Sequence, residues 1–255
     1  MRGRALVAAA VLSLAAAPAF ADDFHPVDPD NLLVVDTSKG RVIVELRPDI
    51  APNHVARVKA LVRKGYFDDD VFYRVQPNFV VQTGTKTVGG DNTSGMGTLK
   101  AEFSFHPAAP IKPVVLGAGF SGGMPVAVDA DGTAWPKFCP GTASTAHYDD
   151  PNSADSQIFF LTGPALSLDR TFTAWGRVVA GQDVLRQMAP GEPPPAPDHL
   201  IKAHIASELP EAERPKVLVA DPGTPTFQAA IEKAEQTNGG YLDNICLVVP
   251  PVEVK

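Results

Sequence analysis

The alternation of apolar and polar positions predicts a chain made mainly of short strands. Two β-branched runs, 32–36 and 41–46, flank a short turn that ends at Gly40, and this pattern predicts a hairpin. Further strand-rich blocks occupy 71–82, 157–161 and 172–179. We therefore expect a mainly-β fold in which helices are a minority.

Helical spacing is clearest over 52–64. Apolar side chains recur there at Val55, Val58, Leu61 and Val62. Pro52 stands at the start and Gly65 follows the last turn, so both ends of an amphipathic helix are marked. A second, shorter helix is predicted over 183–188.

Two proline-rich segments interrupt the strand pattern. The first, 106–140, holds six prolines and one hairpin-like piece that turns near Asp131, so we expect an inserted excursion. The second, 190–197, holds five prolines and predicts an extended spacer. The 58 residues behind it include a capped helix that begins near Thr224, and they are too few for an independent domain. We expect them to pack on the body.

The N-terminus carries the pattern of a secretory signal. Arg2 and Arg4 precede an apolar run, and Ala19-Phe20-Ala21 resembles a processing site, so cleavage is predicted after Ala21, with 1–21 removed. The alternative is a membrane anchor, which needs about 20 apolar residues. This run is shorter and breaks at Pro18. We expect an exported protein, periplasmic or secreted.

Composition and charge exclude several classes of protein. With 44% hydrophobic and 20% charged residues the chain is globular rather than disordered. Removal of the predicted signal leaves 20 basic residues against 29 acidic ones, a net charge of −9. Such a surface disfavours nucleic acid and anionic membranes. We expect a monomer that does not insert into a membrane.

The cysteines and histidines do not suggest a metal site. Cys139 and Cys246 lie far apart, without a CxxC motif or a neighbouring histidine, and the six histidines include no HxH or HExxH pattern. Neither a metal nor a cofactor is expected. In an oxidising compartment the two thiols can form one long-range disulfide, although two buried thiols fit the sequence equally well.

Candidate chemistry is concentrated in the block 72–84. Arg74, Phe79 and Gln82 are spaced by five and three residues. In an unbroken strand Arg74 and Gln82 share one face and Phe79 lies on the other. A bend after Pro77 or at Asn78 resets that phase and brings all three together. Taken alone, the three residues fit an exposed arginine on a sheet, a core phenylalanine and a polar edge glutamine better than they fit a catalytic group.

This block resembles the signature of the cyclophilins, the peptidyl-prolyl cis-trans isomerases. The signature positions matched are Phe72, Arg74, Pro77, Phe79, Gln82 and Gly84, and the segments 151–160, 168–169 and 175–181 resemble later elements of the family. The resemblance covers about 31–105 and 141–190, which sets the isomerase domain at 31–190 with 106–140 inserted and 191–255 appended. It implies a closed eight-stranded antiparallel barrel capped by two helices.

The resemblance also implies an activity and its residues. An exported bacterial member would isomerise X-Pro bonds of exported proteins during folding, with proline-containing polypeptides as partners. Arg74 would donate to the prolyl nitrogen of the twisted bond, Gln82 would bind a substrate carbonyl, and Phe79 would complete the catalytic group. The substrate-binding residues implied are Val80, Ala146, His147, Gln157, Phe159, Leu168 and Phe172. Such a reaction needs no nucleophile, metal or proton transfer.

Departures from the family leave a second function open. Phe172 stands where a pocket histidine is usual, and Ser167 stands where some members carry tryptophan. The alternative is a binding module that keeps the fold but turns over little substrate. Since both cysteines lie outside the part that resembles the family, we also hypothesise that Cys139 anchors the excursion to the tail through Cys246.

Overall fold

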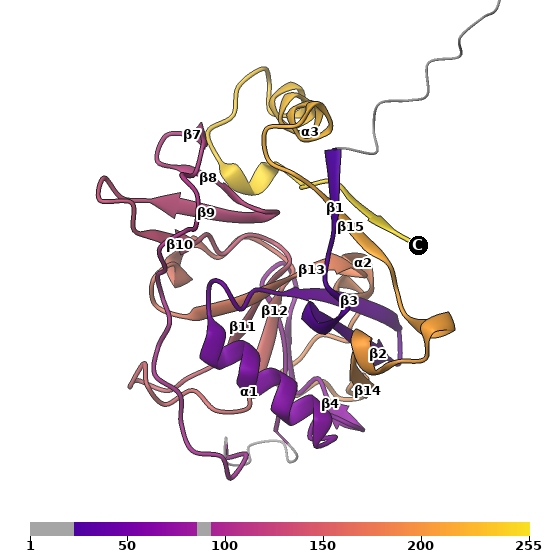
Figure 1. The fold of residues 1–255 in the computed structure, drawn as a ribbon. Coiled ribbons are helices and arrows are strands. Elements are labelled where there is room, and N and C mark those ends of the chain that lie inside the picture. Colours follow the sequence, from indigo (N-terminus) through magenta and orange to yellow (C-terminus); the bar gives the residue numbers. More distant parts are fainter. Residues whose placement is uncertain (1–22, 86–92) are drawn as a thin grey trace, which may run out of the picture.

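The computed structural model describes residues 23–85 and 93–255, and one curled antiparallel sheet forms its body (Figure 1). The strand order is β4-β14-β2-β3-β13-β11-β12-β6-β5. These strands are β2 (Leu32–Thr37), β3 (Gly40–Leu46), β4 (Asp70–Val71), β5 (Arg74–Gln76), β6 (Val80–Thr83), β11 (Thr142–Thr145), β12 (Ile158–Leu161), β13 (Thr173–Ala180) and β14 (His199–Ile205). The predicted signal, 1–21, lies outside the described residues.

The prediction of a closed eight-stranded barrel is wrong, because the sheet has nine strands and stays open. Its two edges, β4 and β5, follow each other in the chain and are separated only by Phe72 and Tyr73. Strand β4 pairs with β14, whereas β5 pairs with β6, so the chain crosses from one edge to the other without a ladder between them. The sheet also continues past Pro190, since β14 lies between β4 and β2.

The predicted N-terminal hairpin is confirmed. Strands β2 and β3 pair in register from Leu32 opposite Glu45 to Thr37 opposite Gly40. Successive side chains of a strand point to opposite faces. Leu33 contributes to the main core of the sheet, whereas Val34 lies in a separate cluster on the other side. Burial of both faces explains why this stretch is a continuous apolar run rather than an alternating one.

The helices predicted from apolar spacing are confirmed, with shifts of a few residues at the ends. They are α1 (Pro52–Arg63), α2 (Gln182–Arg186) and α3 (Pro225–Thr237). Helix α1 buries Val55, Val58, Leu61 and Val62 against the main core. Short 3-10 turns lie at Pro29–Asn31, Leu166–Leu168, Ala206–Glu208, Glu211–Glu213 and Ile245–Leu247. In the described part of the chain, no helix has the length and apolar character needed to cross a membrane.

Helix α1 takes its N-terminal cap from a residue distant in sequence. Ala51 offers no side-chain cap, and the carboxylate of Glu102 takes its place. Glu102 Oε1 accepts from the Asn53 backbone N–H at 3.1 Å, and Oε2 accepts from the His54 backbone N–H at 3.0 Å and lies 2.7 Å from His54 Nδ1. Burial raises the pKa of Glu102, but the hydrogen bonds from His54 and Asn53 outweigh it, so the pKa lies below its ordinary value of 4.5. A carboxylate at a helix N-terminus also complements the helix dipole.

In Glu102→Gln, the free energy of unfolding is expected to fall less steeply than in the wild type as the pH is lowered. A carboxyl whose pKa is depressed on folding stabilises the fold above its unfolded pKa and loses that contribution as pH falls through the folded value. The variant should lose about 1 kcal/mol of unfolding free energy at neutral pH. In urea unfolding followed by circular dichroism, it should therefore converge on the wild type as the pH falls through the depressed folded pKa of Glu102. The exposed Glu253→Gln is a control, and a constant offset at every pH would contradict this role.

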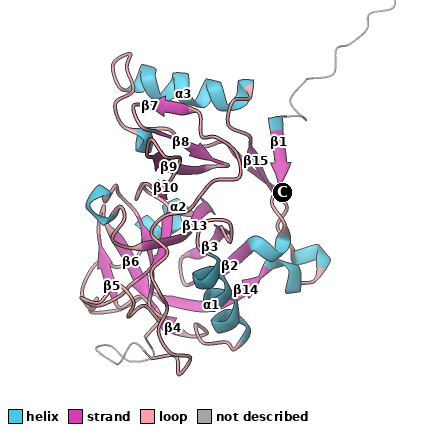
Figure 2. Cartoon of the chain, turned by 60° about the vertical axis from the view of Figure 1, so that its left-hand side comes forward, coloured by secondary structure: helices cyan, strands magenta, loops and turns pink. Residues whose placement is uncertain are grey.

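The insertion and helix α3 of the tail lie together above the curled sheet (Figure 2). The insertion forms a four-stranded sheet, and the tail strands form a three-stranded sheet with the N-terminal strand. Their strands are β7 (Pro113–Val115), β8 (Ala118–Ser121), β9 (Met124–Val128) and β10 (Ala134–Pro136), and β1 (Phe24–Pro26), β15 (Val217–Ala220) and β16 (Val252–Val254). Pairing of β9 with β10 confirms the predicted hairpin. Both segments share a small core in which Phe120 packs edge-on against Phe227.

A disulfide joins the two segments. Cys139 follows β10 of the insertion, Cys246 lies in the last 3-10 turn, and their Cα atoms are 5.0 Å apart. Both cysteines belong to the shared core of the insertion and the tail. The bond therefore closes a loop of 107 positions and joins two segments whose shared core is much smaller than the core of the main sheet.

Candidate active site

A tight turn brings the three predicted catalytic residues together. Arg74 on β5 stands opposite Gln82 on β6 in the antiparallel register. The chain reverses at Asn78, whose φ is 57°, and Phe79 N–H donates to Gln76 O at 3.1 Å. As a result Phe79 leaves the strand phase, and the Arg74 Cζ atom lies 5.5 Å from the centre of its ring. The bend considered at Pro77 and Asn78 is present.

A polar network fixes the orientation of the Gln82 side chain. Its Oε1 accepts from Arg74 Nη1 at 3.4 Å, and its Nε2 donates to Gln157 Oε1 at 3.1 Å and to the Tyr73 hydroxyl. The hydroxyl in turn donates to Gln157 Oε1 at 2.8 Å. Burial raises the pKa of Tyr73 well above its usual range, so it remains a neutral donor at physiological pH. These contacts fix which end of the Gln82 amide donates hydrogen bonds and which end accepts them.

Aromatic rings line the other side of the site. Phe159 on β12 pairs in register with Gln82, and its ring meets Phe172 edge-on at 5.8 Å. The imidazole of His147 stacks on Phe172 at 4.2 Å. Leu168 is half-buried in the 3-10 turn Leu166–Leu168, and its backbone carbonyl accepts a hydrogen bond from the Phe172 N–H at 3.1 Å. Phe159 and Phe172, with His147 stacked on Phe172, therefore form an aromatic wall that begins at the strand position opposite Gln82.

The remaining predicted residues support this wall. Val80 is only 2% exposed, packs in the main core and lies on β6 two residues before Gln82. Ala146 is half-buried, and its N–H donates to Gln157 O at 2.8 Å, which ties the segment before His147 to β12. All ten predicted catalytic and substrate-binding residues therefore fall in one region of the sheet, within β5, β6, β12 and the segments that adjoin them.

Two residues at the site were missed by sequence analysis. Tyr73 lies inside the signature block, so its position was visible, but its role depends on the hairpin register. Glu192 lies in the proline-rich spacer, and its Oε1 is 3.0 Å from Arg74 Nε. Its Oε2 accepts from Gln76 Nε2 at 3.0 Å across 116 positions of sequence. No local pattern marks such a contact.

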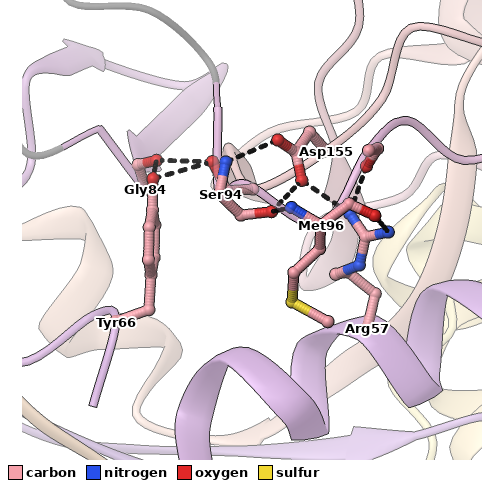
Figure 3. Close-up of polar contacts among 8 residues, drawn as sticks. Arg57, Tyr66, Gly84, Ser94, Met96 and Asp155 are labelled. Atoms are coloured by element: carbon pink, nitrogen blue, oxygen red, sulfur yellow. Dashed lines mark hydrogen bonds and ion pairs between the residues drawn. The ribbon is translucent and has the colours of Figure 1, made fainter. Parts of the chain in front are cut away.

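A buried ion pair between Arg57 and Asp155 binds the loop that follows residue 93 (Figure 3). Asp155 is 4% exposed, and its carboxylate accepts from Arg57 Nη1 at 2.5 Å and from the Ser94 backbone N–H at 2.6 Å. The same guanidinium donates to Met96 O and Gly97 O. Since Asp155 stands two residues before Gln157, the ion pair joins this loop to the strand that carries the wall.

Gly84 ends the signature block for a steric reason. Its φ is 103°, and a Cβ atom there would collide with the Ser156 carbonyl. Gly84 O accepts from Ser156 Oγ at 3.1 Å, and Tyr66 lies alongside with its hydroxyl 3.0 Å from Ser156 Oγ (Figure 3). Only glycine permits this close approach of β6 to the segment before β12.

A cavity of about 1090 Å³ lies elsewhere. It is bounded by β13 and α2 of the body, by the insertion around Met124, and by α3 and the last turn of the tail. None of the predicted catalytic or substrate-binding residues lines it. The candidate active site is therefore the surface around Arg74 and Phe159, and this cavity is separate from it.

Comparison with known proteins settles the family. The family model for the cyclophilin type peptidyl-prolyl cis-trans isomerases matches residues 32–205, more than half of the chain. The chain is a cyclophilin. A probable peptidyl-prolyl cis-trans isomerase of Brucella suis is 32% identical over 197 residues, which are 71% of this chain and 85% of that protein. Peptidyl-prolyl cis-trans isomerase-like 1 of Aspergillus fumigatus is 31% identical over 156 residues, 61% of this chain and 80% of that protein.

Solved structures extend the likeness beyond the cyclophilin core. The crystal structure of cyclophilin AquaCyp293 from Hirschia baltica has a TM-score of 0.83 and 30% identity, and the match covers 92% of this chain and 95% of that one. This coverage exceeds the share of the chain that the family model matches, so it includes residues outside 32–205. A Cryptosporidium parvum cyclophilin, solved with the dipeptide Ala-Pro, shares the fold at a TM-score of 0.51 and 18% identity, over 68% of this cyclophilin and 98% of that chain.

Proposed function

We propose that this peptidyl-prolyl cis-trans isomerase acts on X-Pro bonds of exported bacterial proteins during their folding, with Arg74 as the residue that lowers the barrier. The observation that carries the assignment is the juxtaposition of the Arg74 guanidinium, the oriented Gln82 amide and the aromatic wall of Phe159 and Phe172. Charge and apolar surface face the same small region, as a proline-containing peptide requires.

The chemistry of the reaction explains the need for a cation. Rotation about a peptide bond has a barrier of about 18–20 kcal/mol because the nitrogen lone pair is delocalised into the carbonyl group. When the bond is twisted the lone pair returns to the nitrogen, which becomes a hydrogen-bond acceptor. An arginine N–H directed at that nitrogen stabilises the twisted state and not the planar one, which is the condition for catalysis. No covalent bond forms or breaks.

The other residues would bind and orient the peptide. Gln82 is held by Arg74 on one side and by Tyr73 and Gln157 on the other. Its Oε1 keeps a second lone pair for a substrate N–H, whereas a substrate carbonyl would take a Nε2 hydrogen now donated to Tyr73 or Gln157. The rings of Phe159 and Phe172 would pack on the pyrrolidine. An apolar pocket favours the twisted amide, since loss of resonance makes that state less dipolar.

A protease-coupled assay on a short Ala-Pro peptide tests the activity. Uncatalysed X-Pro isomerisation takes tens to hundreds of seconds at 25 °C. Micromolar enzyme should therefore produce a clear acceleration above the uncatalysed rate. A rate equal to the uncatalysed one would instead assign the protein to the binding-module alternative.

Export is proposed from the sequence of the first 21 residues. The contacts of Asp23 support cleavage directly before Asp22, because Asp23 takes part in the folded chain. Its carboxylate accepts from the Thr226 backbone N–H at 3.1 Å and from the Thr226 hydroxyl at 2.6 Å, at the start of α3. A mature chain that begins at Asp22 retains this contact.

N-terminal sequencing of the protein from envelope or culture fractions is expected to begin at Asp22. A precursor whose Ala19 and Ala21 are both replaced by leucine should accumulate unprocessed. Recovery of Met1 from the envelope fraction would contradict cleavage and favour a membrane anchor.

A further inference from the structure

The start of the proline-rich spacer forms an additional partner for β5. Val75 N–H donates to Gly191 O at 2.8 Å, and Gly191 N–H donates to Val75 O at 3.0 Å, so the two residues form an antiparallel bridge. Strand β5 carries Arg74, and this bridge places Glu192 beside it. The spacer therefore adjoins the candidate active site, although it lies 116 positions further along the chain.

The Glu192 carboxylate binds two side chains of β5 at once. Oε1 lies 3.0 Å from Arg74 Nε, and Oε2 accepts from Gln76 Nε2 at 3.0 Å. Residues 74 and 76 share a face of the strand, since side chains alternate. A single carboxylate can therefore bridge them, and the second contact fixes the carboxylate that meets the arginine.

The backbone, rather than a freely rotating side chain alone, sets the position of Glu192. Gly191 has a φ of 149°, and a Cβ atom there would lie 2.5 Å from Pro194 Cα. Only glycine fits this turn. The prolines that follow restrict the chain further, because each fixes its own φ near −65°. The turn therefore restricts the backbone conformations at Glu192 and places this residue next to Arg74.

We propose that Glu192 is a positioning residue for Arg74, an inference that rests on the proposed function. Glu192 holds the Nε edge of the guanidinium, while Gln82 holds Nη1. Two fixed edges define the plane of the group and direct its remaining N–H donors. Arginine suits such a site because its donors form a rigid fork, so binding one edge orients the others. The spacer thereby contributes to catalysis without touching the substrate.

Variants at position 192 separate positioning from charge. Glu192→Ala is expected to lower kcat by about three- to fivefold with KM within about twofold, because an exposed ion pair contributes modestly. Glu192→Gln keeps an acceptor for Nε and should fall between the alanine variant and the wild type. Glu208→Ala is the matched control: Glu208 also pairs with an arginine, Arg63, at 2.6 Å and is similarly exposed, and its removal should leave kcat unchanged. Equal losses in Glu192→Ala and Glu192→Gln, or a gain in either, would overturn positioning.

A double-mutant cycle then tests whether Glu192 acts through Arg74. Single-turnover rates are measured for the wild type, Glu192→Ala, Arg74→Ala and the double variant, with thermal unfolding midpoints for each. We expect Glu192→Ala to have no further effect once Arg74 is alanine. The same three- to fivefold loss in both backgrounds would refute the inference, because Glu192 would then act independently of Arg74. If Arg74→Ala keeps full isomerase activity, the proposed function fails. If Arg74→Ala loses most of its activity but Glu192→Ala keeps the wild-type rate, only this inference fails.

Discussion

Replacement of Arg74 by alanine is expected to lower kcat/KM for an X-Pro peptide by about 10²- to 10³-fold, with little change in peptide affinity. Removal of a preorganised donor that acts only in the transition state typically has an effect of this size, about 2.7–4 kcal/mol. Arg74 sits at the centre of the Gln82 and Glu192 contacts, so the charge it presents is fixed before substrate arrives. The measurement is a protease-coupled rate together with a peptide titration on the folded variant.

Two further variants sharpen this expectation. Arg74→Lys keeps the charge but lacks the planar fork that meets Gln82 and Glu192, so charge alone should not restore the rate. Phe79→Ala should weaken peptide binding as well as turnover, because it removes apolar surface beside the guanidinium. Turnover close to the wild-type value in a folded Arg74→Ala variant would contradict the catalytic assignment.

Loss of the disulfide between Cys139 and Cys246 is expected to reduce the free energy of unfolding by up to about 4–5 kcal/mol. The bond closes a loop of 107 positions, and in the chain-entropy description the stabilisation grows with the length of the loop closed. It also joins the insertion to the tail, whose shared core contains few buried residues. The Cys139→Ser/Cys246→Ser variant should therefore unfold at a clearly lower urea concentration than the oxidised wild type.

Controls for this variant distinguish the bond from the side chains. Wild-type protein treated with a reductant should unfold like the double serine variant, since both lack the cross-link. Isomerase activity at 25 °C should change little, because the residues of the site lie on the main sheet. Thiol titration of the unfolded, non-reduced protein should find no free thiol, and detection of two would show that both cysteines are reduced.

Local patterns in the sequence predicted the elements but not how the sheet ends. The β2–β3 hairpin and α1 follow from turn chemistry and apolar spacing, which depend on neighbouring residues alone. Closure of the sheet depends on whether the short strands at Asp70–Val71 and Arg74–Gln76 pair with each other, and they instead pair with β14 and β6. The family resemblance led to a closed barrel because it carries topology without these particular registers.

The site shows the same division between local and distant information. Arg74, Phe79 and Gln82 belong to one block, so their spacing was visible and only the turn at Asn78 remained open. Contacts made across long sequence separations were not visible, namely those of Glu192 with Arg74 and of Glu102 with the start of α1. Carboxylates in turn-rich segments are usually solvated, so nothing in their surroundings marked these two.

The most direct test of Arg74 catalysis is exchange NMR on an unmodified Ala-Pro peptide, since one sample reports both binding and cis-trans exchange. We expect the wild-type enzyme to bind the peptide and to accelerate exchange far beyond the uncatalysed rate of once in tens to hundreds of seconds. Arg74→Ala should shift the peptide resonances to a similar extent at similar concentration while leaving exchange at least about 10²-fold slower than in the wild type. Binding by both proteins with equal acceleration, or with none from either, would contradict the role of Arg74.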